Sequence, residues 1–236
     1  SFYLRGKIPN ESRPTVFEFS GSFDNLRGKK GSRPNPVQGK VKIDQLHIAT
    51  FWPYLKNVLP SVLQDGWLSL GANFSGNLRG NLHSEGELKY ITTAPGQKPI
   101  IKGSDSSKSG IMEYSIFLDT NSIEVEDFKL QSDPINFSVV GKLDGFKSQN
   151  PRVSFAVQTS EFDTEKTRQH LPLMFFPESV HKELNQKINN GSIEIKSLEF
   201  NGTLAQLLNL GSKENSDLFS AEIFLRQVDW NSPLPP

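Results

Sequence analysis

The chain has 236 residues, with 26 Lys plus Arg and 26 Asp plus Glu, so its formal net charge is zero. A neutral chain lacks the basic field expected of a nucleic-acid-binding protein. The absence of cysteine excludes disulfides, thiolate metal sites and a cysteine nucleophile. Hydrophobic residues make up 35%, with 17 Phe, which is enough apolar material for one large all-β unit or two smaller domains.

The N-terminal segment predicts strands from its first residues. Ser1–Gly6 has neither the charged region nor the apolar run of a signal peptide, and it resembles a strand that is already under way. We therefore expect a piece of a longer chain, with any targeting or anchoring segment outside it. In Val16–Phe23, alternate residues are apolar, which places Phe17, Phe19 and Phe23 on one face of a strand.

The same period of two continues along most of the chain. It recurs in Trp67–Phe74, in Ile135–Val139, in Val153–Val157, in Ile193–Ile195 and in Phe219–Leu225. Strict alternation indicates strands with one buried and one wet face, and a recurrent wet face favours an antiparallel sheet. Turn-forming residues at Arg27–Pro36, Gly103–Gly110 and Asp144–Pro151 predict loops between the strands.

Two stretches break this rhythm, and we expect helix only there, within Thr50–Gln64 and Asp163–Asn190. Pro53 suits the first position of a helix, and Asp163 suits an N-cap. Apolar side chains of both insertions are expected to cover part of the apolar sheet face: Phe51, Trp52, Tyr54, Leu55, Phe175, Phe176, Val180, Leu184 and Ile188.

These features occur twice in the same order. The first copy, at about residues 15–90, contains Phe19–Phe23, Asn35–Val37, Phe51, Leu59-Pro60, Gly66–Leu70 and Phe74–Leu78. The second copy, at about 135–210, contains Val139–Leu143, Asn150–Val153, Phe162, Leu171-Pro172, Gly191–Ile195 and Phe200–Leu204. Repetition of a strands–helix–strands unit predicts an extended array that propagates one sheet.

This order of motifs, over roughly Thr15 to Leu210, resembles the AsmA-like family, including its YhdP-type members. The matching pattern is an alternating strand, a Phe, a helical Leu-Pro stretch, then Gly-x-Φ-x-Φ and Φ-x-Gly-x-Φ, where Φ is an apolar residue. The resemblance implies a mainly β fold, in which an extended, curled antiparallel sheet with short helical insertions forms an open groove, the repeating β-groove. Residues 1–236 would then be a fragment of a longer β-groove array.

The resemblance also implies a function. Such proteins are periplasmic bridges that carry phospholipids between the inner and outer membranes. The anchor in the inner membrane, and any partner proteins, would lie outside this chain. Phospholipid acyl chains are the expected partner, and neither a cofactor nor a metal is expected.

The residues supply an independent physical reason for such a task. A continuous apolar sheet face must be covered by something, and acyl chains gain about 0.8 kcal/mol for each buried CH₂ group. Alternation alone leaves both outcomes open, a closed core or an open groove. The candidate lining residues share the apolar face of alternating strands: Phe17, Phe19, Leu68, Leu70, Phe74, Ile135, Phe137, Val139, Phe155, Val157, Ile193 and Ile195.

No catalytic motif appears in the sequence, so we expect a protein that is not an enzyme. The four histidines form no His-Glu-x-x-His pair, and no nucleophile elbow, phosphate loop or dinucleotide fingerprint is present. The alternative function is a structural or assembly β-domain that binds protein partners through its sheet edges.

Overall fold

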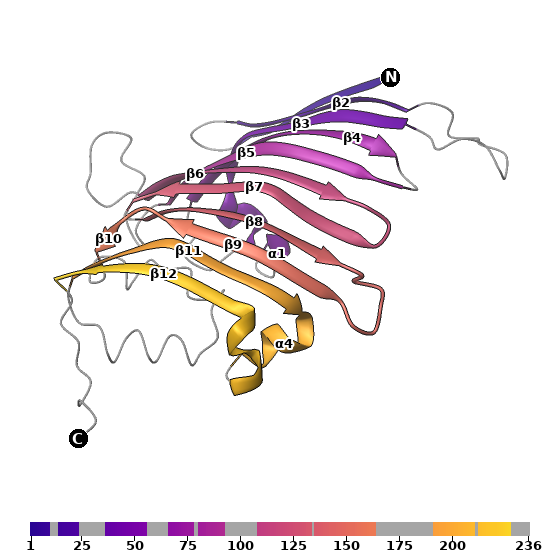
Figure 1. Ribbon diagram of the computed structural model, residues 1–236. Coiled ribbons are helices and arrows are strands. Elements are labelled where there is room, and N and C mark those ends of the chain that lie inside the picture. Colours follow the sequence, from indigo (N-terminus) through magenta and orange to yellow (C-terminus); the bar gives the residue numbers. More distant parts are fainter. Residues whose placement is uncertain are drawn as a thin grey trace, which may run out of the picture.

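The computed structural model describes residues 1–9, 14–23, 36–55, 66–77, 80–92, 108–133, 135–163, 191–210 and 212–227. These residues form mainly strands (Figure 1). The strands are β1 (Phe2–Ile8), β2 (Thr15–Phe23), β3 (Pro36–His47), β4 (Gly66–Asn77), β5 (Leu82–Thr92), β6 (Lys108–Leu118), β7 (Ser122–Ser132), β8 (Ile135–Asp144), β9 (Arg152–Thr159), β10 (Phe162–Asp163), β11 (Ser192–Thr203) and β12 (Phe219–Arg226).

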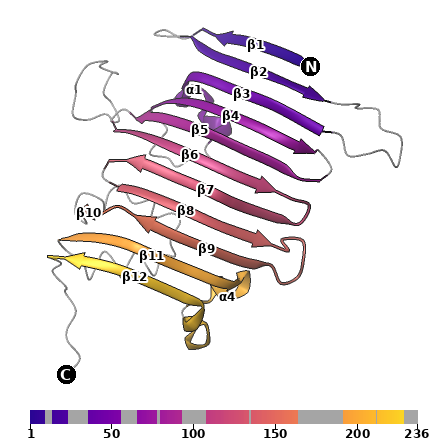
Figure 2. The same cartoon turned by 45° about the horizontal axis from the view of Figure 1, so that its top comes forward.

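All twelve strands belong to one antiparallel sheet, in which each strand from β1 to β8 pairs with the next in sequence. β11 then pairs with β9, β10 and β12. The sheet is a single curled layer, and its two edges, β1 and β12, lie at opposite sides (Figures 1 and 2). The expected fold class, a curled antiparallel sheet that stays open, is therefore confirmed.

Helix is scarce, as expected, but its bounds differ from the prediction. α1 spans Ile48–Leu55, so Pro53 lies inside the helix and not at its first position. The helix begins earlier because Ile48 is completely buried against Leu46 and Leu68, and this packing overrides the proline signal. Residues 56–64 of the predicted helix lie outside the described residues.

The second insertion also begins differently. Asp163, the expected N-cap, pairs with Ser192 in the short strand β10, because the chain returns to the sheet beside β11. Residues 164–190, including Phe175, Phe176, Val180, Leu184 and Ile188, lie outside the described residues.

Two short helices after β11 were not predicted. The helix α4 (Leu204–Leu208) starts with a capping box between Thr203 and Gln206, and the 3₁₀ helix η3 (Lys213–Leu218) leads into β12. No described helix has the length and apolar character to cross a bilayer.

Two of the predicted loops are shorter than expected. Pro36 already belongs to β3, and Lys108–Gly110 belongs to β6, because both segments find pairing partners on the neighbouring strand. The remainder of those two loops lies outside the described residues. The third predicted loop is present as a turn between β8 and β9, where Gly145 adopts a positive φ of 70°.

Buried apolar side chains form two separate clusters. One joins Leu46, Ile48 and Leu68, with Phe51 and Trp52 of α1 packed against it. The other joins Ile135, Phe162 and Ile193, with Ile195 beside it. Both lie at the same margin of the sheet, where α1 and β10 attach, and we call it the insertion margin.

The clusters occupy matching places in the two sequence copies. Leu68 and Ile193 stand at the same point of the repeated Gly-x-Φ motif, and both are buried. Each belongs to a twelve-residue strand, β4 or β11, that pairs with the second strand of the preceding hairpin, β3 or β9. The two places thus share this pairing, although α1 precedes β4 in the first copy and β10 precedes β11 in the second.

Candidate functional site

One face of the sheet is apolar along its whole length, because directly paired residues of neighbouring strands share a face. We call it the apolar face and describe it by rows that cross the strands. One row runs through Leu4, Phe19, Val41, Ala72, Gly86, Tyr114, Phe128, Val139, Val157, Leu198 and Ala221. A neighbouring row runs through Gly6, Phe17, Ile43, Leu70, Leu88, Met112, Leu130, Phe137 and Thr159.

Among the side chains that the structure describes on these strands, none on the apolar face is charged. Lys108, which pairs with Thr92 at the start of β6, is in register with this face, and its side chain lies outside what the structure describes. The few polar side chains of the apolar face form hydrogen bonds with neighbouring groups. The Tyr90 hydroxyl donates to Ser132 Oγ at 2.8 Å, and Thr15 Oγ1 donates to the Gln45 carbonyl at 2.8 Å. The face therefore presents almost no free hydrogen-bonding group from its side chains.

All twelve predicted lining residues lie on this face. Phe17, Phe19, Leu68, Leu70 and Phe74 occupy β2 and β4, and the other seven occupy β8, β9 and β11. The rows also contain residues that the sequence analysis missed, mainly from β5, β6 and β7: Leu88, Met112, Tyr114, Ile116, Phe128 and Leu130. Their alternation could have placed them, since each strand again has apolar residues at every second position.

Most of the apolar face is only partly covered. Among described hydrophobic side chains, the buried ones are Val37, Leu46, Ile48, Leu68, Ala72, Ile135, Phe162, Ile193 and Phe200. α1 lies inside the curl of the sheet and covers the face near β3 and β4 (Figure 1). Phe51 and Trp52 make the expected contacts with the sheet, whereas Tyr54 is 82% exposed, so its predicted contact is wrong. The Leu55 side chain lies outside what the structure describes.

Aromatic rings on the apolar face lie against glycines of the neighbouring strand. The paired residues are Phe2 and Gly21, Phe74 and Gly39, Tyr114 and Gly86, and Tyr90 and Gly110. A Cβ atom added to any of the four glycines would approach the aromatic side chain of the partner to within 3.0 Å. Each glycine thus leaves room for a large side chain beside it, which buries ring area without a second layer.

The opposite face, which we call the polar face, carries charge in balanced pairs. Lys42 pairs with Asp44 at 2.8 Å, Lys129 with Asp127 at 2.7 Å and Lys142 with Glu124 at 3.5 Å. The hydrogen bond that Lys42 donates to Asp44, and then the charge of Asp44, raise the pKa of Lys42, and Asp127 raises the pKa of Lys129 in the same way.

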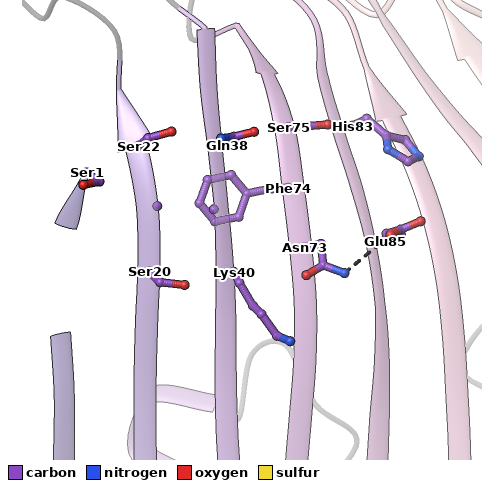
Figure 3. Close-up of a pocket in the computed structure, with 12 residues that line it drawn as sticks. Ser1, Ser20, Ser22, Gln38, Lys40, Asn73, Phe74, Ser75, His83 and Glu85 are labelled. Carbon is purple, nitrogen blue, oxygen red and sulfur yellow. Dashed lines mark hydrogen bonds between the residues drawn. The ribbon is translucent and has the colours of Figure 1, made fainter. Parts of the chain in front are cut away.

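A shallow hollow of about 490 Å³ lies on the polar face over β2 to β5, and we call it the polar hollow. Two rows of side chains line it (Figure 3). One row contains Ser20, Lys40, Asn73 and Glu85, and the other contains Ser22, Gln38, Ser75 and His83. Asn73 Nδ2 donates to Glu85 Oε1 at 3.4 Å, so a hydrogen bond joins two neighbouring side chains of this row.

Of the two histidines that the structure describes, His83 has the more polar surroundings. Its Nε2 lies 2.9 Å from Ser115 Oγ and 3.1 Å from Glu126 Oε2, and Ser115 Oγ donates to the same carboxylate oxygen. Serine and glutamate both contact one ring nitrogen, so the glutamate does not orient the far nitrogen as a catalytic triad requires. Among described residues, no three His, Asp or Glu side chains converge on a possible metal site.

Comparisons with known proteins add no relative from which a role could be carried over. No family model, no curated protein and no solved structure matches this chain, so its function has to be argued from the sheet itself.

Proposed function

We propose that this chain is a non-enzymatic segment of a periplasmic bridge-like protein that carries phospholipids between the inner and outer membranes along the apolar face. The observation that carries the proposal is one sheet face across eleven paired strands on which no described side chain is charged, and most of which is only partly covered by described residues. At roughly 4.8 Å per strand, this face is about 50 Å long.

Acyl chains fit such a surface for physical reasons. They need contiguous apolar contact and no particular hydrogen bonds, and burial of each CH₂ group contributes about 0.8 kcal/mol. The rows provide that contact over several neighbouring positions, and rings such as Phe128 and Phe137, stacked at 5.8 Å, add flat apolar area. The periplasmic location and the membrane anchor outside this chain are parts of the proposal that derive from the family resemblance.

Photocrosslinking tests the proposal. A photoreactive amino acid replaces Phe137 on the apolar face or, as control, Ser138 on the polar face of the same strand. A second pair, Leu88 and Lys89, repeats the comparison three strands away. After illumination with phospholipid vesicles, mass spectrometry should find lipid adducts at Phe137 and Leu88 only. Equal labelling of both faces, or none at the apolar positions of a folded protein, would contradict the proposal.

The exposed edges of the sheet favour a second candidate function, protein binding by strand pairing. Both edge strands are exposed, and β12 carries Ile223, Phe224 and Leu225 at an edge that no described strand pairs with. Long apolar edges without proline or lysine are templates for added strands, which favours a module that binds proteins by strand pairing. Native mass spectrometry of the purified chain separates the two: bound phospholipid supports transport, and a lipid-free complex with another chain supports assembly.

A further inference from the structure

The polar hollow gathers several polar groups that have no partner among the described residues. Of the five lysines in β3 to β9 whose side chains the structure describes, four form ion pairs and Lys40 forms none. The side chains of Ser20, Gln38 and Ser75 make no hydrogen bond to another described residue. The hollow thus combines a cation without an ion pair with donors and acceptors that a ligand could contact.

The hollow exists because small and large side chains alternate there. Ser20 and Ser75 are short, while Lys40, Glu85 and His83 are long and stand around them (Figure 3). The strand spacing of about 4.8 Å and the repeat of about 6.8 Å along a strand place these groups on a grid. Several polar groups of one ligand could therefore be contacted at once.

Aromatic side chains flank this grid on both sides. Tyr3 pairs directly with Ser20 at one end of the first row, and it is 65% exposed. Phe117 pairs directly with His83 at the other side of the hollow. An exposed tyrosine offers a ring face for apolar contact together with a hydroxyl for hydrogen bonding.

We propose that the polar hollow is a binding site for a neutral saccharide chain. Hydroxyl, amide, carboxylate and ammonium groups together supply donors and acceptors that match sugar hydroxyls. Lys40 and Glu85 lie in the same row and balance in charge, so the site favours neither an anion nor a cation. This site lies on the face opposite the apolar face, and the proposal does not depend on lipid transport.

Other ligand classes fit the same residues less well. A phosphate group needs several cations or free backbone N–H groups. The hollow has one lysine, and the backbone N–H groups beneath it are hydrogen-bonded between the paired strands. A metal needs more than the pair of Glu85 and His83. A peptide in strand conformation adds at a sheet edge, whereas the hollow extends across β2 to β5.

Saturation-transfer NMR on the full chain tests this site with three soluble probes: tetramers of N-acetylglucosamine, of β-1,4-linked glucose and of α-1,4-linked glucose. At least one should bind saturably at millimolar concentration and shift the side-chain amide signals of Gln38 and Asn73. Gln38→Ala and Lys40→Met should weaken that binding about fivefold to tenfold, the effect of one or two lost hydrogen bonds.

Matched variants on the same face control for general effects. Gln158→Ala on β9 and Lys129→Met on β7 should leave the affinity unchanged, because both residues lie outside the hollow. The amide shifts of the unsubstituted protein keep the test informative if a variant does not fold. Failure of all three probes to bind, equal weakening by hollow and control variants, or displacement of the sugar by inorganic phosphate would each overturn the proposal.

Discussion

Gly110 allows a direct test of how this sheet buries aromatic rings without a second layer. Its nearest neighbours are Cε1, Cζ and the hydroxyl oxygen of Tyr90, each 2.5 Å from the position that a Cβ would occupy. The Tyr90 hydroxyl also donates a 2.8 Å hydrogen bond to Ser132 Oγ. In Gly110→Ala, the new methyl group displaces the ring, and we expect the displaced hydroxyl to lose its acceptor.

The expected cost combines three contributions. Displacement of a well-packed ring costs about 1–3 kcal/mol, and the lost hydrogen bond costs about 0.5–1.5 kcal/mol. Replacement of a strand glycine by alanine returns about 0.5–1 kcal/mol, because the unfolded chain becomes less flexible. The net loss in the free energy of unfolding should be about 2–3 kcal/mol.

Equilibrium urea unfolding, followed by circular dichroism, measures this loss. Gly71→Ala is the matched control, because a Cβ at Gly71 meets nothing within 4 Å, and it should be neutral or stabilising by about 0.5–1 kcal/mol. In a Tyr90→Leu background, Gly110→Ala should cost less than about 1 kcal/mol, since the ring is gone. Equal costs for Gly110→Ala and Gly71→Ala, or an unchanged cost without the ring, would refute this account of ring packing.

Three further predictions follow from other parts of the sheet. Ile48→Ala and Ile193→Ala should each destabilise by about 2–5 kcal/mol, and in the double variant the two losses should add in urea unfolding, because the clusters share no residue. Asp at Leu70 and Phe137 together should abolish transfer of fluorescent phospholipid between vesicles, because unpaired charge on an apolar surface is costly, whereas Asp at Ser138 should be tolerated. Lys42 should titrate above free lysine in NMR, because Asp44 raises its pKa. The stability that this ion pair contributes is then fully present below the pKa of Lys42 in the unfolded chain, and it is lost as the pH rises through the pKa in the folded protein. Asp44→Asn should return the pKa of Lys42 to its ordinary range.

Much of the fold was accessible from the sequence because a period of two fixes the faces of a strand without any knowledge of its partners. Phe137 and Ser138 must lie on opposite faces in any sheet, so the apolar face could be listed residue by residue. The coverage of that face was not accessible in the same way. Whether α1 contacts the sheet through Phe51 or Tyr54 depends on the helix start, and the burial of Ile48 sets that start through residues distant in sequence.

The polar hollow was missed for a related reason. One of its rows combines Ser20, Lys40, Asn73 and Glu85 from four strands, which are separated by loops of different lengths. Only the register of those pairings brings the four side chains into one line. Serine and asparagine in alternating strands carry no local signal that distinguishes a site from an ordinary wet face.

The β-bulges leave a signature in the sequence that could have been recognised. Apolar residues occupy odd positions at Ile123 and Val125 but even positions at Phe128 and Leu130, and the register of β7 shifts between those pairs. A bulge adds one residue and reverses the phase of the alternation, so the same face stays apolar on both sides of it. The same reversal separates Ile195 from Leu198 in β11.

That second bulge also explains an irregularity of the repeat. Gly66 and Gly191 are 125 positions apart, whereas Gly76 and Gly202 are 126 apart, so the second copy gains one residue between them. The gain falls where β11 shifts register between Ile195 and Ser197, and β4 pairs with β5 without a shift along its whole length. A single added residue would have turned Phe200 to the polar face in a regular strand. The bulge keeps Phe200 on the apolar face, where it is buried and stacked on Phe155 at 5.7 Å. Both copies thus present their apolar residues to the same side despite different lengths, as the proposed lipid-carrying surface requires.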